Sequence, residues 1–81
     1  MKHATESALL TLAPLLDELR KRPMREKKLG IFYVKSQSFL HFHEDPAGLF
    51  ADLRAGDEFD RYPVNTQAEQ TALLKAVDRA L

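Results

Sequence analysis

Residues 39–54 read FLHFHEDPAGLFADLR and decide how the chain folds. Apolar and polar residues alternate on both sides of the segment DPAG, residues 45–48, in which Pro and Gly occupy their preferred turn positions. Alternation with a period of two is typical of a strand with one buried face. The segment therefore predicts two antiparallel strands, 38–44 and 49–55, joined by a tight turn.

The same alternation continues on both sides of this hairpin. A weak turn signal at Ser36-Gln37 and a stronger one at Gly56-Asp57 predict two further strands, 29–35 and 58–64. Pro63 has no amide hydrogen to donate to a ladder, so strand 58–64 should lie at an edge or end there. Residues 29–64 thus predict a four-stranded antiparallel meander.

Helical patterns flank the strands. Segment 5–22 carries a leucine stripe three or four residues apart, typical of an amphipathic helix: Leu9, Leu12, Leu16 and Leu19. Pro14 either kinks this helix or begins a second one, and we expect a kink because the stripe keeps its phase. Thr66 followed by Glu69 is a capping-box pattern and predicts a second helix over 66–81.

These elements predict one α+β domain over residues 1–81, in the order α-β-β-β-β-α, with both helices packed mainly on one sheet face. The chain has 81 residues, 44% hydrophobic and 30% charged, and no Cys, which excludes disulfides and thiolate metal sites. It has no apolar run near the about 18 residues of a membrane span and no signal-peptide pattern. We therefore expect a cytoplasmic protein with no membrane partner.

The expected turns fix the register and sort the strand residues onto two faces. One face should form the core under the helices: Ile31, Tyr33, Leu40, Phe42, Leu49, Ala51, Leu53, Tyr62 and Val64. The opposite face, the open face, should carry Phe32, Val34, Phe39, His41, His43, Phe50, Asp52, Arg54, Phe59 and Arg61.

Within the open face one cross-strand row should contain Phe32, His41, Asp52 and Arg61. A carboxylate between an imidazole and a guanidinium stabilises a sheet. If Asp52 pairs with His41, its charge acts to raise the pKa of His41, and Arg61 opposes this contribution by occupying the same carboxylate.

The aromatic residues of the open face need a cover, because soluble monomers seldom expose such a patch. A second copy of the chain packed face to face would provide it, and so would a small ligand or a peptide, or one helix on each face. The first hypothesis is therefore a non-enzymatic binding or regulatory module, a homodimer, acting through Phe32, Phe39, His41, His43, Phe50, Asp52, Arg54, Phe59 and Arg61.

A second hypothesis is a metal-binding protein or small metalloenzyme. His41 and His43 point the same way from one strand, and Asp52 lies across from His41, so these residues could hold a divalent metal ion. No other cofactor is predicted. A His and Asp pair could also act as acid and base, but no nucleophile joins the row, so a non-enzyme is favoured.

A third hypothesis is a nucleic-acid contact. Segment 20–28 holds six basic residues: Arg20, Lys21, Arg22, Arg25, Lys27 and Lys28. The net charge of the chain is zero, which favours a basic helix end followed by a solvated linker. We therefore expect nucleic acid not to be a partner.

Residues 29–54 resemble a family of small uncharacterised bacterial proteins and, distantly, the bacterial domain labelled "luciferase". In that domain an H-x-H strand is followed by a D-L or D-I strand, as in His41-Phe42-His43 and Asp52-Leu53 here. The resemblance implies a bacterial α+β domain and no defined activity. The chain lacks the Trp-containing strand of that domain, so no catalytic role is carried over.

Overall fold

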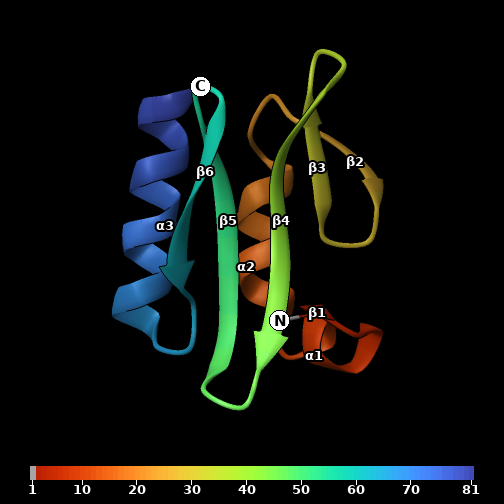
Figure 1. Ribbon diagram of the computed structural model, residues 1–81, viewed down its shortest axis with the longest axis vertical. Coiled ribbons are helices and arrows are strands. Elements are labelled where there is room, and N and C mark those ends of the chain that lie inside the picture. The colour runs from red at the N-terminus through yellow and green to blue at the C-terminus, as the bar shows by residue number, and fades with distance from the viewer. Residues whose placement is uncertain (1) are drawn as a thin grey trace.

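The computed structural model describes residues 2–81 (Figure 1). Its elements are β1 (Lys2–His3), α1 (Glu6–Leu10), α2 (Ala13–Arg20), β2 (Arg25–Lys28), β3 (Ile31–Val34), β4 (Gln37–Asp45), β5 (Gly48–Ala55), β6 (Glu58–Pro63) and α3 (Gln67–Ala80). All pairings are antiparallel, in the order β2-β3-β4-β5-β6, with β1 beside β4. The α+β class is confirmed. The prediction of four strands was wrong, because β2 extends the meander and β1 pairs with β4 beside it.

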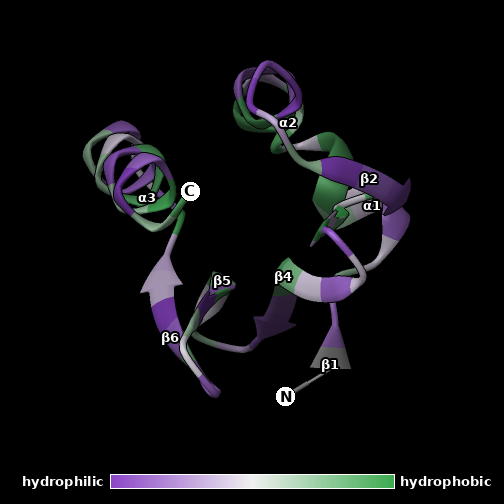
Figure 2. Ribbon diagram, turned by 90° about the horizontal axis from the view of Figure 1, so that it is seen from above, coloured by the Kyte–Doolittle hydropathy of each residue, from purple (hydrophilic) through white to green (hydrophobic). Residues whose placement is uncertain are grey.

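The sheet curves around α2 and α3, which lie on the same side of it (Figure 2). Leucines of α1 and α2, residues of α3 and the inward residues of the central strands form one buried cluster, including Leu16, Leu19, Leu40, Leu73 and Val77. Arg22 also joins α2 to α3, since its Nε donates to Asp78 Oδ1 at 2.9 Å. Both helices therefore cover one face, as predicted. Within residues 2–81 no helix combines the length and apolar character needed to cross a membrane.

The first helical segment is broken rather than kinked at Pro14. Helix α1 ends at Leu10 and α2 begins at Ala13, so Pro14 lies in the first turn of α2. There a missing amide hydrogen costs nothing, because first-turn amides have no partner within a helix. The leucine stripe still faces inward, since Leu9 and Leu16 are both buried. The prediction of one kinked helix was wrong.

The second helical segment agrees with its sequence signal. The Thr66 hydroxyl accepts a hydrogen bond from the Glu69 amide at 3.1 Å, and the Glu69 carboxylate accepts one from the Thr66 amide at 3.1 Å. This reciprocal pair satisfies amides that a helix start otherwise leaves open. The capping box is therefore confirmed, with α3 beginning at Gln67.

The three strands β4, β5 and β6 pair in the predicted register. His41 lies opposite Asp52, and Asp52 lies opposite Arg61. The turns at 46–47 and 56–57 carry strong Pro and Gly signals, which fix the loop length and hence the register. Pro63 ends β6 at a sheet edge, as predicted.

The hairpin between β3 and β4 differs from its prediction. Val34 pairs with Gln37, so the loop is Lys35-Ser36, one residue earlier than expected, and Lys35 adopts φ 58°. Between the next two pairs, Tyr33 with Ser38 and Phe32 with Leu40, strand β4 contains one extra residue, Phe39. This β-bulge changes the register along the hairpin.

The altered register changes which β3 residues reach the core. Phe32 lies opposite Leu40 and is fully buried, so its placement on the open face was wrong. Phe39 is also buried, in the same core cluster, so its assignment to an exposed surface was wrong. Ile31 and Tyr33 alternate with Phe32 and are only partly buried, so their assignment to the core face was wrong.

Glycine at position 30 is required by two features of the turn between β2 and β3. Its φ is +76°, and a Cβ there would lie 2.8 Å from Leu9 Cδ2. Gly56 has a similar φ of +66° with no heavy atom within 4 Å of such a Cβ. Both positions therefore favour glycine because of their positive φ, and only position 30 also lacks room for a side chain.

We expect Gly56→Ala to lower the free energy of unfolding by about 1 kcal/mol through its positive φ alone. Gly30→Ala should lower it by about 1 kcal/mol more, because Leu9 must move. Urea denaturation of both variants measures the difference. Equal losses would contradict the packing of Leu9 against the β2–β3 turn.

Candidate metal-binding site

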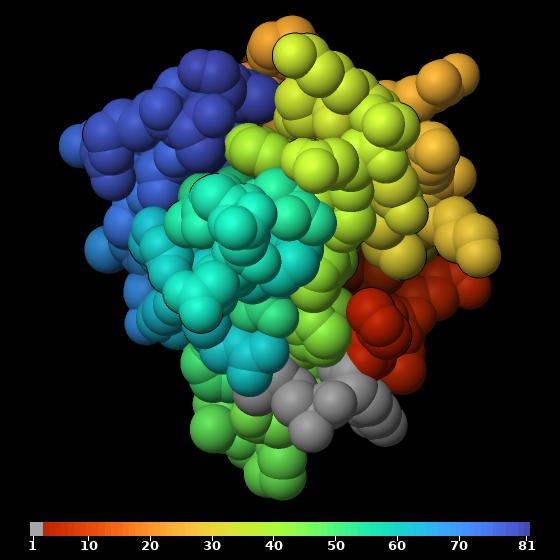
Figure 3. Space-filling model, turned by 45° about the horizontal axis from the view of Figure 1, so that its top comes forward, coloured from red at the N-terminus to blue at the C-terminus, as the bar shows by residue number. Residues whose placement is uncertain are grey.

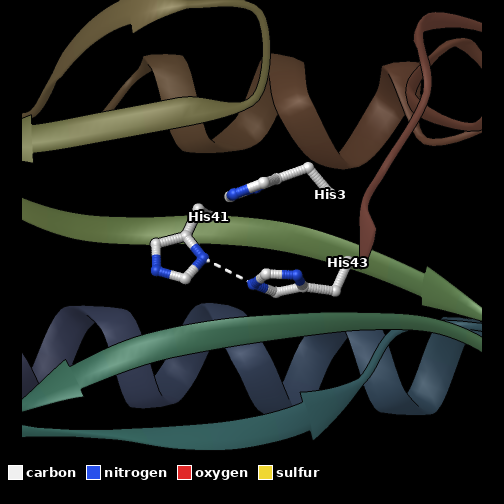
Figure 4. Close-up of side chains that lie close together, drawn as sticks. All are labelled: His3, His41 and His43. Atoms are coloured by element: carbon white, nitrogen blue, oxygen red, sulfur yellow. Dashed lines mark hydrogen bonds between the residues drawn. The ribbon is translucent and has the colours of Figure 1, made fainter. Parts of the chain in front are cut away.

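The three histidines of the chain meet on the sheet face away from α2 and α3 (Figure 4). His41 and His43 are two residues apart on β4 and therefore point to the same face. Strand β3 pairs only with residues 37–40 of β4. The later part of β4 is thus free to pair with β1, which places His3 opposite His43.

The imidazole rings are close enough to interact directly. His3 stacks on His43 with ring centroids 4.8 Å apart, and it meets His41 edge-on at 5.9 Å. His41 Nδ1 lies 2.9 Å from His43 Nε2. One ring nitrogen from each residue can be chosen such that all three lie within 4.8 Å of one another.

Asp52 lies beside this cluster and is the one charged residue in the buried set of the described chain. Arg61 donates two hydrogen bonds to it, from Nε to Oδ1 at 2.7 Å and from Nη2 to Oδ2 at 2.8 Å. His43 Nε2 lies 3.1 Å from Oδ2. The Arg61 hydrogen bonds hold the pKa of Asp52 below its usual value, so the carboxylate is ionised at neutral pH.

The hydrogen bonds indicate which nitrogen of His43 carries its proton. An ionised carboxylate can only accept, so a His43 ring with one proton carries it on Nε2, which faces Asp52 Oδ2 and also lies 2.9 Å from His41 Nδ1. Nδ1 of His43 then has no proton and carries a lone pair that can accept a hydrogen bond. It is buried and has no hydrogen-bond partner among the described residues. A buried acceptor without a donor is costly, and a bound cation would satisfy it.

Burial lowers the pKa of His41, and the neighbouring His43 lowers it further. Asp52 acts in the opposite direction, as the sequence suggested, but does not outweigh burial. The net shift of the His41 pKa is therefore downward. A neutral imidazole at pH 7 is the protonation state that binds metal.

The structure brings together part of the predicted site and adds one residue to it. His41, Asp52 and Arg61 form a row as predicted, whereas Phe32 does not join them. Asp52 is held by Arg61, which leaves His3 as the third imidazole in the group that could hold an ion. No local sequence pattern pointed to His3, because its place in the group depends on the pairing of β1 with β4.

The remaining residues of the open face form a smaller apolar surface than predicted. Phe50 and Val34 are partly buried, and Phe59 is 36% exposed. Phe59 lies between two polar side chains, with its ring centroid 4.8 Å from that of His41 and 4.7 Å from Arg54 Cζ. With Phe32 and Phe39 inside the core, the patch that motivated a dimer is reduced.

The basic segment is largely engaged within the chain. Arg20 pairs with Asp17 and Glu26, Lys21 with Glu18, and Arg22 with Glu18 and Asp78: a set of ion pairs that spans α2, β2 and α3. On β2 the Lys27 ammonium lies 4.4 Å from the centroid of the Tyr33 ring. Residues 25–28 form an edge strand rather than the predicted linker, and its charges protect that edge from pairing.

No protein-family model, curated protein or solved structure matches the chain. The resemblance to the "luciferase"-labelled domain therefore stays a prediction.

Asp52→Asn should lower the free energy of unfolding by about 2 kcal/mol at pH 7, because it leaves Arg61 and His43 without their carboxylate. The folded pKa of Asp52 lies below the unfolded one, so this stabilisation is present above about pH 4 and lost as pH falls through the folded value. Urea denaturation with EDTA at pH 7 and pH 3 measures it, and the variant should differ from wild type less at pH 3.

Asp60→Asn is the matched control, since Asp60 is exposed on the same strand as Arg61. It should change stability by less than about 0.5 kcal/mol at either pH. An Asp52→Asn variant that behaves like this control would show that the carboxylate is not paired as described.

Proposed function

We propose that this protein binds a divalent first-row transition metal ion, with zinc as the reference ion, through His3, His41 and His43. The observation that carries the proposal is the convergence of three ring nitrogens within 4.8 Å, together with the unpartnered Nδ1 of His43. Imidazole is a preferred ligand of zinc, copper and nickel.

The imidazole rings must reorient around an ion, because the chosen ring nitrogens lie up to 4.8 Å apart. Zinc binds imidazole nitrogen at about 2.0–2.1 Å, so two nitrogens of a tetrahedral site lie about 3.4 Å apart. His3 is exposed and belongs to a strand of two residues, so it can make this adjustment most easily. His41 and His43 come from the central strand β4 and supply the rigid part of the site.

Asp52 and Arg61 would support the ligands rather than replace them. A carboxylate that accepts a hydrogen bond from a metal-binding imidazole fixes the ring and increases its basicity. Asp52 is positioned for this role at His43, and Arg61 fixes Asp52 in turn. Three protein ligands leave a fourth position of a tetrahedral ion for water or a small ligand.

Zinc titration of tag-free, EDTA-treated protein, followed by calorimetry, tests the proposal. We expect one ion per chain with micromolar or tighter affinity, and cobalt should produce visible absorption bands of a four-coordinate ion. His43→Ala should weaken binding at least 100-fold, and Asp52→Asn should weaken it about 10- to 100-fold.

His3→Ala removes a ligand from an exposed position and so cannot fail by unfolding the core, while Asp60→Asn is the control and should bind as wild type does. Failure to bind zinc stoichiometrically would refute the proposal. So would a His3→Ala variant and a His43→Ala variant that both bind zinc with wild-type affinity.

Metal binding should also slow hydrogen exchange in the N-terminal strand. The amide of Ala4 donates to the Phe42 carbonyl at 3.1 Å, immediately after His3. A zinc ion shared by His3 and β4 would hold this bond closed, so exchange at Ala4 should slow about tenfold or more at saturating zinc. The Val64 amide, bonded to the Leu49 carbonyl at 3.1 Å, is a control that lies far from His3 in the chain. Equal exchange at Ala4 with and without zinc would show that His3 is not a ligand.

The interaction-module hypothesis has less support than the metal site. That hypothesis was based on a predicted exposed aromatic face. Two of the four phenylalanines assigned to that face are buried in the core. A homodimer through the remaining surface around Phe59 stays a prediction. Sedimentation of wild type and Phe59→Glu tests it, and a monomer in both would end it.

A further inference from the structure

A pocket lies at the end of the sheet, between the β3–β4 hairpin, the β5–β6 turn and the last turn of α3. Figure 3 shows these three segments side by side on one face of the molecule. The cavity volume of the pocket is about 490 Å³, within the range of small-molecule sites. The residues that matter here are Val34, Lys35, Phe39, Arg54, Gly56 and Ala80.

The pocket exists because β4 and β5 separate at this end. Their ladder ends at the pair Leu40 with Leu53, next to the bulge at Phe39. Beyond that pair the strands are bridged by a side chain, since Arg54 Nε donates to the Ser38 carbonyl at 2.6 Å. Bulges that end strand pairing are common beside binding sites.

The charge of the pocket is positive. Arg54 is held with its guanidinium 4.7 Å above the Phe59 ring, and its Nη1 makes only a long contact of 3.4 Å, to the Gly56 carbonyl. Lys35 is the second cation of the wall, and no carboxylate lines the pocket. Within residues 2–81 neither cation forms an ion pair.

The rest of the wall favours a singly charged ligand with an apolar body. Phe39, Val34 and Ala80 offer apolar contact. Ala80 is also the last residue of α3, and a helix C-terminus carries partial negative charge. That charge disfavours a phosphate dianion more than a carboxylate. The planar guanidinium edge matches the two oxygens of a carboxylate.

We infer that this pocket binds a small organic carboxylate, with the carboxylate on Arg54 and Lys35 and the apolar part against Phe39 and Val34. The site is separate from the proposed metal ligands and does not depend on metal. It lies next to them through Phe59, which contacts both His41 and Arg54.

Amide chemical shifts during a benzoate titration, with EDTA present, test the inference. We expect saturable shifts confined to residues 34–39, residues 54–56 and the end of α3 around Ala80, with a millimolar dissociation constant typical of a ligand of this size. Benzamide, the neutral isostere, should bind at least tenfold more weakly, and phenyl phosphate should bind no more tightly than benzoate. Equal affinity for benzoate and benzamide, or no saturable shift at these residues, would overturn the inference.

Substitutions of the two basic residues test whether Arg54 and Lys35 bind the carboxylate of benzoate. Arg54→Gln should abolish saturable binding, and its spectrum reports whether it folds. Lys35→Asn keeps a residue that tolerates positive φ while removing the charge, and should weaken benzoate about three- to tenfold. Arg25→Gln, on β2, is the charge-matched control and should leave affinity unchanged. Wild-type affinity in Lys35→Asn, or an equal loss in Arg25→Gln, would show that charge in this pocket does not recognise the ligand.

Discussion

The buried carboxylate of Asp52 is the constraint around which the proposed metal site is arranged. An ionised group in a buried position is tolerated only when its hydrogen bonds are made. Asp52 makes them to Arg61 on β6 and to His43 on β4, so one side chain of β5 ties three strands together. The same contacts orient the His43 ring and indicate its tautomer. The chemistry of the cluster thus follows from the pairing of the carboxylate.

One extra residue in β4 has effects at both ends of the sheet. The bulge at Phe39 changes the register with β3 and places Phe32 in the core. It also lies where the β4–β5 ladder ends and Arg54 bridges the gap. Because β3 pairs with only the first part of β4, the rest accepts β1 and with it His3. The histidine cluster and the proposed carboxylate pocket therefore both lie along β4 where one of its neighbouring strands has stopped pairing with it.

The part of the fold that can be predicted from the sequence is the part whose turns have strong sequence signals, with Pro or Gly at preferred turn positions. DPAG and Gly56-Asp57 set the register that places His41, Asp52 and Arg61 in a row. Ser36-Gln37 is a weak signal, and a turn shifted by one residue with a bulge beyond it sends Phe32 to the other face.

Other features had no local signal. Strands β1 and β2 read KH and REKK, without apolar alternation, so their pairing arises only from neighbouring strands that need partners. His3 joins the cluster for the same tertiary reason. The direction of the His41 pKa shift depends on burial, which a pairing diagram does not contain.

The most direct test of this account is the ¹⁵N spectrum of the three imidazoles before and after one equivalent of zinc at pH 7.5. Without metal, His43 should be the Nε2–H tautomer, because Asp52 accepts that proton. With zinc, one nitrogen of each of His3, His41 and His43 should shift as a metal ligand. An Nδ1–H tautomer of metal-free His43, or zinc-induced shifts that leave His43 unchanged, would contradict the account.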